Sequence, residues 1–206
     1  SEVAYVPVES MNVMKRMLVH PSNMPTPDQL PEAHRINDLH IAGKDSELPY
    51  EGMMLTTKVA EAGRKVRLAD GPDYFDLLLS GITLDNIALI GIPGEPFMGV
   101  GKGLKETEGW DLVIPSCLTN GDIGYFPMME AYVEGGYEAG SSPFKAGTAE
   151  QIISEGQALL SQLALQILHF LFHSLFQSLG VCGKLQSVGS HLQQSFLQIH
   201  LATLVG

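Results

Sequence analysis

The sequence predicts an α/β or α+β fold, in which a mixed β-sheet is flanked by helices and followed by a helical, apolar C-terminal tail. Short apolar runs bounded by Asp-Gly, Ser-Gly and Asp-Asn turns alternate with stretches of helical periodicity, which is typical of mixed folds. With 206 residues, 45% of them apolar, the chain is long enough to bury a core of its own.

The first part of the chain is expected to be mainly helical. After a short extended opening, residues 11–20 are interpreted as one or two helical turns, and a proline-rich loop follows. A helix then begins near Thr26, an N-cap residue followed by proline, and ends at Gly43. A second helix is expected over 50–62 and is ended by Gly63.

From Lys65 onwards the pattern changes to short strands. "KVRLADG" and "YFDLLLSGITLDNIALIGIPG" contain β-rich runs broken by turns. Residues 87–92 are nearly all apolar, as in a strand buried on both faces. A short helix over 96–106 and a second buried strand over 111–117 follow. A later helix begins near Thr148, which with Gln151 resembles a capping box.

The composition changes near Gln162, which divides the chain into a domain portion, 1–162, and a tail, 163–206. All 23 acidic residues lie at or before Glu155, and the tail carries one charged residue, Lys184, where the chain average predicts about seven. Four interpretations of the tail stay open. The first is a membrane span, and the second is a helix lying on a partner or lipid surface. The third is a helix packed on the domain, and the fourth is a segment foreign to the fold, such as one from a shifted reading frame.

Charge and motif content exclude several classes of function. The net charge of -11 opposes nucleic-acid binding, which depends on Lys and Arg neutralising phosphates. Cys117 and Cys182 form no disulfide framework and are expected to be unpaired thiols. His169 and His173 are spaced i, i+4 but lack the intervening Glu of a metalloprotease helix, so they are interpreted as polar breaks in an apolar helix. Serine-nucleophile and Walker motifs do not occur, and the glycines of "GVGKG" lie inside a predicted helix.

Glu95 is the first candidate functional residue. It lies in Pro93-Gly94-Glu95-Pro96, after a buried strand and before a helix, where open α/β folds often place their sites. The alternative is an ordinary glutamate at the N-cap of that helix.

Two further loops carry candidate residues. In "NGDIGYFP", Gly121 and Gly124 let the backbone approach another group closely, and Asp122 or Tyr125 presents an oxygen. The alternative is a turn with a packed tyrosine. A third loop, "GGYE", is rich in glycine and presents Tyr137.

Together these loops resemble a known family, the neutral/alkaline (non-lysosomal) ceramidases and their bacterial relatives. The motifs are "ALIGIPGEPF", "NGDIGYFP" and "GGYEAGSSPF", and the separation of twelve between Tyr125 and Tyr137 matches the family's spacing. The resemblance runs from about residue 25 to residue 163. It implies that the chain carries only the late part of a catalytic domain, so that it begins inside a longer protein.

The resemblance implies a zinc site. Glu95 and Tyr125 would be zinc ligands, and Tyr137 would hydrogen-bond the substrate carbonyl or the developing oxyanion. The zinc of the family activates a water that hydrolyses the amide of an N-acyl sphingoid lipid. Its histidine ligands lie in upstream motifs that do not occur here: His20, His34 and His40 stand in other contexts. Asp122 replaces a tyrosine common in the family's loop, which leaves lipid specificity open.

We therefore expect zinc-dependent hydrolysis of an amide bond in an N-acyl lipid, completed by histidines from the upstream part of the same catalytic domain. The chain alone is expected to be inactive. The alternative is a non-catalytic binding or structural fragment of the same fold, associated with a membrane or a partner through its tail. The substrate is an N-acyl lipid or another amide, and a membrane surface is a further partner to consider. The resemblance favours a secreted, periplasmic or membrane-associated location.

Overall fold

The computed structural model describes Tyr5 and residues 7–178, with side chains described up to Leu168. The chain divides after Ala164 into two units, and the fold described below is that of the first. The last helix, α6 (Thr148–Ser178), begins in that unit, so the helix expected near Thr148 is confirmed. No helix in the described part of the chain is long and apolar enough to cross a membrane. The predicted boundary at residue 162 stays a prediction.

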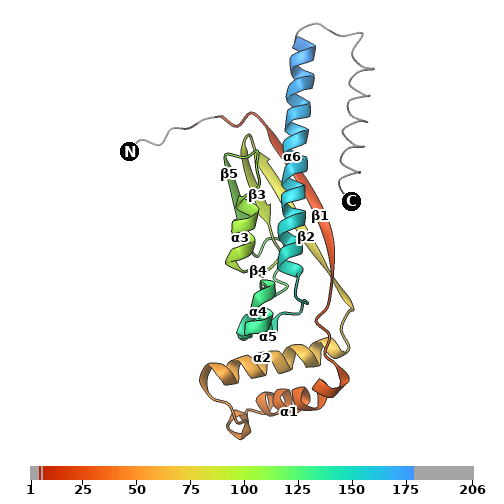
Figure 1. The fold of residues 1–206 in the computed structure, drawn as a ribbon, viewed down its shortest axis with the longest axis vertical. Coiled ribbons are helices and arrows are strands. Elements are labelled where there is room, and N and C mark those ends of the chain that lie inside the picture. Colours follow the sequence, from red (N-terminus) through yellow and green to blue (C-terminus); the bar gives the residue numbers. More distant parts are fainter. Residues whose placement is uncertain (1–4, 6, 179–206) are drawn as a thin grey trace. The chain divides into compact units, whose positions relative to one another are not determined.

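A four-stranded mixed sheet lies at the centre of the first unit (Figure 1). Its strand order is β1-β2-β3-β5, with antiparallel pairing except between β3 and β5, which are parallel. The strands are β1 (Met11–Pro21), β2 (Tyr74–Leu84), β3 (Ile87–Gly91) and β5 (Leu112–Ser116). The mixed sheet flanked by helices confirms the predicted fold class.

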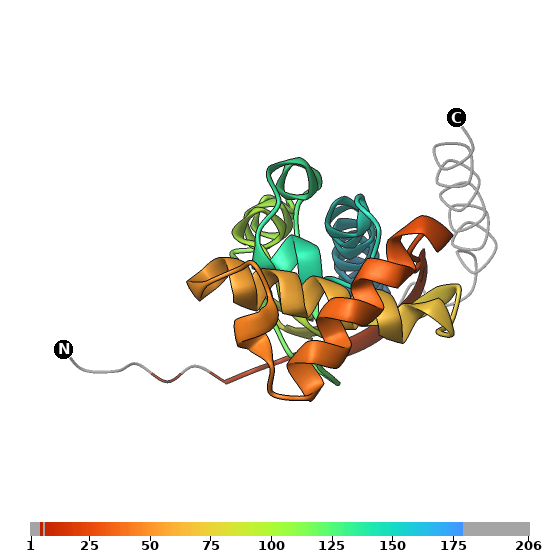
Figure 2. The same ribbon diagram turned by 90° about the horizontal axis from the view of Figure 1, so that it is seen from below.

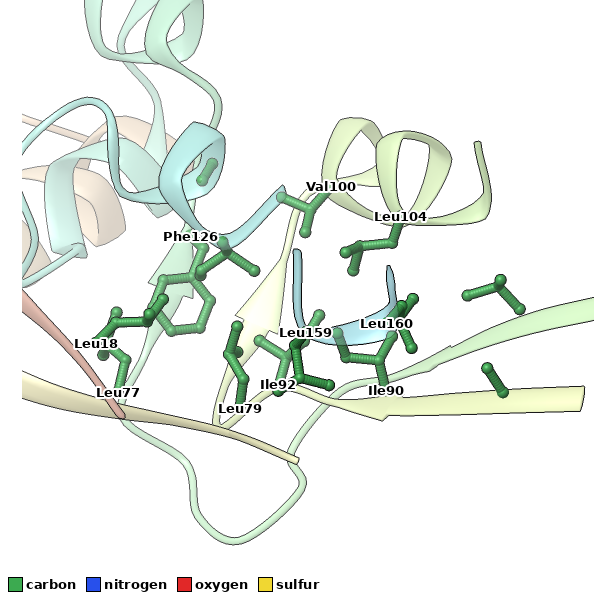
Figure 3. Packing of buried hydrophobic residues seen from close by; sticks show 14 of the residues in the cluster. Leu18, Leu77, Leu79, Ile90, Ile92, Val100, Leu104, Phe126, Leu159 and Leu160 are labelled. Atoms are coloured by element: carbon green, nitrogen blue, oxygen red, sulfur yellow. The ribbon is translucent and has the colours of Figure 1, made fainter. Parts of the chain in front are cut away.

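Two helices cover the inner face of this sheet and form the main core. The first, α3 (Met98–Lys105), connects the parallel strands β3 and β5, and the second is α6. Figure 3 shows sheet side chains meeting side chains of both helices. These side chains are fully buried: Leu77, Leu79, Ile90, Val100, Leu104, Leu159 and Leu160. The expected strands at 87–92 and 111–117 and the helix between them are thus confirmed. The predicted burial of the 87–92 strand on both faces is wrong, because Ile87 on the outer face of the sheet is 39% exposed, as is Ile114 in the next strand.

A helical hairpin forms a second, smaller core (Figure 2). It consists of α1 (Leu30–Ile41) and α2 (Gly52–Ala69), with 3-10 turns η1 (Pro27–Gln29) and η2 (Asp45–Glu47) before and between them. Ala33, Ile36, Leu48 and Ala62 are buried between these elements. Thr26 is the N-cap of η1, and its backbone N–H donates to the Gln29 side chain at 3.1 Å, which confirms the predicted helix start.

The remaining elements are short and follow strands β3 and β5 in the sequence. A two-stranded parallel sheet pairs β4 (Glu95–Pro96) with β6 (Tyr125–Phe126). Two short helices follow, α4 (Met129–Glu134) and α5 (Tyr137–Ser141), and α5 packs against α2. These elements carry the candidate residues.

The outer face of the main sheet, opposite α3 and α6, is exposed and mostly apolar, although Lys15 and Asp76 also lie on it. In β1, Met11, Val13, Met17 and Val19 are 55–67% exposed. The register continues this apolar face across the sheet, pairing Val13 with Ile82, Ile82 with Leu89 and Leu89 with Ile114. A contiguous exposed apolar surface is typical of a site that contacts another protein segment or a membrane.

Two local predictions about the N-terminal part are wrong. Residues 11–20 form β1 rather than helical turns, because their side chains alternate between the two faces and the strand pairs along its whole length with β2. Gly63 does not end the second helix. α2 continues to Ala69 because Ala62 and Leu68 pack inward, so residues 65–69 are helical and not β.

The predicted capping box at Thr148 does not form. The Thr148 hydroxyl donates to the Lys145 carbonyl at 2.8 Å. The Gln151 side chain instead lies 2.6 Å from Nδ1 of the buried His20, which links α6 to β1. The sequence spacing is compatible with a capping box, but the Gln151 side chain contacts His20 on β1 instead.

Candidate active site

Two backbone segments that follow the parallel strands build the candidate site. The segment after β3 and the segment after β5 are joined by hydrogen bonds from Leu118 N–H to the Gly94 carbonyl at 2.9 Å and from Glu95 N–H to the Gly124 carbonyl at 3.0 Å. Ile123 N–H also donates to the Pro93 carbonyl at 3.2 Å. The carboxyl ends of parallel strands meet at one sheet edge, so both loops reach the same place.

Gly94 is required by this close approach. A Cβ placed there would lie 2.4 Å from the Gly124 carbonyl oxygen and 2.8 Å from the ring of Phe126. Gly124 itself has φ +103°, a conformation that favours glycine. The prediction that glycine allows a close backbone approach in this loop is confirmed at Gly124. It is wrong at Gly121, where a Cβ would meet nothing within 4 Å.

The structure brings Glu95, Tyr125 and Tyr137 together. Glu95 and Tyr125 are partners in the β4–β6 pair. The rings of Tyr125 and Tyr137 meet edge to face, with centroids 5.9 Å apart and planes at 74°. Glu95 is exposed and both tyrosines are half-buried. Phe97, not Glu95, is the N-cap of α3, so the alternative interpretation of Glu95 as a helix cap is wrong.

The electrostatics of Tyr125 matter for metal binding. Burial raises the pKa of its phenol above the usual value, and the nearby Glu95 charge raises the pKa further. At neutral pH the phenol is therefore protonated and able to donate a hydrogen bond. A phenolate at this position requires a cation close enough to offset the charge of Glu95.

Asp122 shapes the loop. Its carboxylate accepts a hydrogen bond from Gly124 N–H at 3.2 Å, as in an Asx turn. The same loop holds two non-glycine residues in the left-handed region, Leu118 at φ 53° and Asn120 at φ 65°. The Asn120 amide donates to the Ser80 hydroxyl at 2.9 Å. Backbone strain of this kind persists only where surrounding hydrogen bonds hold it.

Two residues that the sequence did not single out position Tyr125. The buried Ser142 hydroxyl donates to the Tyr125 carbonyl at 2.9 Å. The Tyr132 hydroxyl donates to the Phe144 carbonyl at 2.8 Å and lies 3.1 Å from the Ser142 hydroxyl. Ser142 lies within "GGYEAGSSPF", but a motif does not indicate which backbone a serine bonds. The network fixes β6 against the segment after α5.

The metal ligands present in the described residues form an incomplete set. No group of three or more His, Cys, Asp or Glu side chains that could hold a metal ion occurs in the part of the chain that the structure describes. Glu95 and Tyr125 together offer two oxygen donors, whereas a catalytic zinc takes three protein ligands. The residues present thus fit part of a zinc site.

The other candidate side chains lie elsewhere. His20 contacts Gln151, His40 contacts Asp45 at 2.9 Å, and His34 is exposed on α1. The side chains of His169 and His173 lie outside the described residues. Cys117 is exposed with a free thiol, as predicted, and Cys182 also lies outside the described residues.

Comparisons with known proteins found partial structural likenesses. No family model matches the sequence, and no curated protein does. A neutral ceramidase from Pseudomonas aeruginosa has a TM-score of 0.41 and 19% identity over 44% of this chain and 16% of its own. A ceramidase complexed with C2 has a TM-score of 0.41 and 19% identity over 46% and 16%. The chain thus spans 16% of the length of these structures.

Proposed function

We propose that this chain supplies Glu95, Tyr125 and Tyr137 to the site of a zinc-dependent amide hydrolase that acts on an N-acyl lipid. The observation that carries the proposal is the convergence of these three residues, predicted from three separate motifs, at the carboxyl end of the parallel pair β3–β5. Such an edge is where α/β folds place their sites.

Each residue has a defined part in the proposed chemistry. Glu95 and Tyr125 would hold the metal, which would polarise the amide carbonyl and lower the pKa of a bound water. Tyr137 donates a hydrogen bond from its hydroxyl to the oxygen that gains negative charge. The charge of Glu95 raises the pKa of Tyr125, and binding of a cation to both groups reverses that effect.

The proposal requires further ligands. Histidines from an upstream part of the same domain complete the metal site, and that part is a partner in the full protein. The exposed outer face of the sheet offers an apolar surface against which such a part packs. We place the full protein outside the cytoplasm or at a membrane surface, where N-acyl lipids are reached.

A second candidate function is a binding or structural role without catalysis. The observation that favours it is the lack of a complete metal-ligand group in the described residues. The two functions differ in one measurable property, because only the hydrolase depends on metal at Glu95.

The test uses the longest form of the protein that contains this sequence, assayed for release of the amine from an N-acyl sphingoid amide. Glu95→Gln is expected to abolish hydrolysis, and Tyr137→Phe to lower kcat by roughly 10²–10³ without changing zinc content. Glu130→Gln, an exposed glutamate on α4, is the matched control and leaves the rate unchanged. Full activity in Glu95→Gln would refute the assignment of Glu95, and hydrolysis undetectable in the parent protein would favour the binding role.

A further inference from the structure

Arg64 is a buried cation that lacks an acidic partner. Its side chain is 5% exposed in the middle of α2. Nε donates to the Gly140 carbonyl at 2.9 Å and Nη1 to the Asn23 carbonyl at 2.7 Å. None of the ion pairs among the described residues includes Arg64. Burying a charge without an opposite charge costs free energy, which an anionic ligand would offset.

The nearest acid on the same helix is already neutralised. Glu61 accepts hydrogen bonds from Lys58 at 3.0 Å and from Lys65 at 2.7 Å. Two lysines thus share one carboxylate, and Arg64 adds a third positive charge. In a chain with a net charge of -11, this segment of α2 is a local excess of positive charge.

Arg64 lines a cavity of the size that small ligands occupy. The cavity measures about 690 Å³ and lies between α2 and the α4–α5 region, with Gly135, Gly136 and Ala139 in its wall. Pockets for small ligands usually have volumes of roughly 300–1,000 Å³. Lys58 and Arg64 supply its positive charge. Met53 and Met54, which are 72% and 56% exposed, supply an apolar wall.

We propose that this cavity binds a small amphiphilic carboxylic acid, with its carboxylate on Arg64 and its apolar body along Met53 and Met54. A planar guanidinium pairs with a carboxylate through charge-assisted hydrogen bonds. Glu61 also lines the cavity, so a singly charged carboxylate meets less repulsion than a doubly charged phosphate. Methionine is a polarizable and adaptable side chain that suits an apolar ligand body. The site is separate from Glu95 and Tyr125, and it stands whether or not the proposed hydrolase is correct.

Calorimetric titration of the full chain with octanoate tests this site, with octanol and octylamine as ligands of similar length and different charge. Octanoate is expected to bind at least about tenfold more tightly than either, and added salt weakens its binding. Arg64→Gln is expected to weaken octanoate binding at least about tenfold. Arg35→Gln, whose guanidinium is exposed on α1 and paired with Glu32, is the control and leaves binding unchanged.

A second variant keeps the test decisive, because Arg64 also joins α2 to two other segments and its loss could unfold them. Met54→Glu places a negative charge on the exposed cavity wall without removing any hydrogen bond, and it is expected to weaken octanoate binding several-fold. Equal binding of octanoate and octanol would overturn the proposal. So would octanoate binding that is unaffected by Met54→Glu, or the lack of octanoate binding to the folded parent chain. Binding of a lysate peptide or a vesicle with no response to octanoate would contradict it as well.

Discussion

Replacing Gly94 by alanine tests the packing that builds the candidate site. The added Cβ would lie 2.4 Å from the Gly124 carbonyl oxygen, where ordinary van der Waals contact begins at 3.4 Å, and 2.8 Å from the Phe126 ring. The carbonyl belongs to the backbone and cannot rotate away. The two segments must therefore separate, which weakens the hydrogen bond from Glu95 N–H to Gly124.

The cost follows from this geometry. Overpacking of a tight contact costs about 1–3 kcal/mol, and a weakened backbone hydrogen bond adds about 1 kcal/mol. The lower entropy of the unfolded alanine chain offsets less than about 1 kcal/mol. We expect Gly94→Ala to lower the free energy of unfolding by about 2 kcal/mol, which in a chain of this size lowers Tm by about 4–8 °C.

Urea unfolding followed by circular dichroism measures this change. Gly101→Ala is the matched control, because Gly101 lies in α3 and a Cβ there meets nothing within 4 Å. It is expected to raise the free energy of unfolding by about 0.5–1 kcal/mol, as alanine does in a helix. If Gly94→Ala proved as stable as the parent chain, the close approach of the two segments would be wrong.

Three further predictions follow from single contacts. Tyr132→Phe removes the hydroxyl that donates to the Phe144 carbonyl and is expected to cost about 1–2 kcal/mol by thermal unfolding, whereas Tyr5→Phe, an exposed tyrosine, should cost nothing measurable. Leu104→Ala opens a cavity in the main core and is expected to cost about 2–5 kcal/mol; a loss below about 1 kcal/mol would mean that α3 does not pack on the sheet as described. The raised pKa of Tyr125 favours the folded chain at pH values below the usual tyrosine pKa, and this contribution is lost as pH rises through the folded-state pKa. Absorbance titration at alkaline pH should therefore show an ionisation above the usual tyrosine pKa that becomes smaller in Tyr125→Phe; an unchanged titration curve would contradict the prediction.

The sequence predicts well those elements whose signals are local. The apolar run of β3 and its stop at Pro93-Gly94 give both the strand and the turn that carries Glu95. The strand β1 was missed because its partner β2 lies about sixty residues later, and only that pairing makes its alternation informative. The predicted end of the second helix at Gly63 was wrong for a related reason. A glycine inside a helix costs roughly 1 kcal/mol, but the burial of Ala62 and Leu68 on the same helix outweighs this cost.

The same distinction between local sequence signals and contacts of distant residues applies to the candidate site. The order and spacing of three motifs, through their resemblance to a known family, selected Glu95, Tyr125 and Tyr137 as candidates, and the three residues lie together in the fold. The hydrogen bond from Ser142 to the Tyr125 backbone could not be predicted, because many serines in such a loop have the same local sequence signal. Arg64 escaped attention because arginine is usually exposed, and only its tertiary contacts bury it.

The most direct test of the central claim, that Glu95 and Tyr125 are two ligands of one metal, is the ionisation of Tyr125 in the presence of zinc. The phenol is followed by ultraviolet difference absorbance at mildly alkaline pH while zinc is added to the longest form of the protein that contains this sequence. Zinc is expected to lower the pKa of Tyr125 and produce a phenolate signal that Tyr125→Phe and Glu95→Gln both abolish, while Tyr137→Phe keeps it. A phenolate signal of the same size in Glu95→Gln, or no signal in the parent protein at saturating zinc, would contradict the claim.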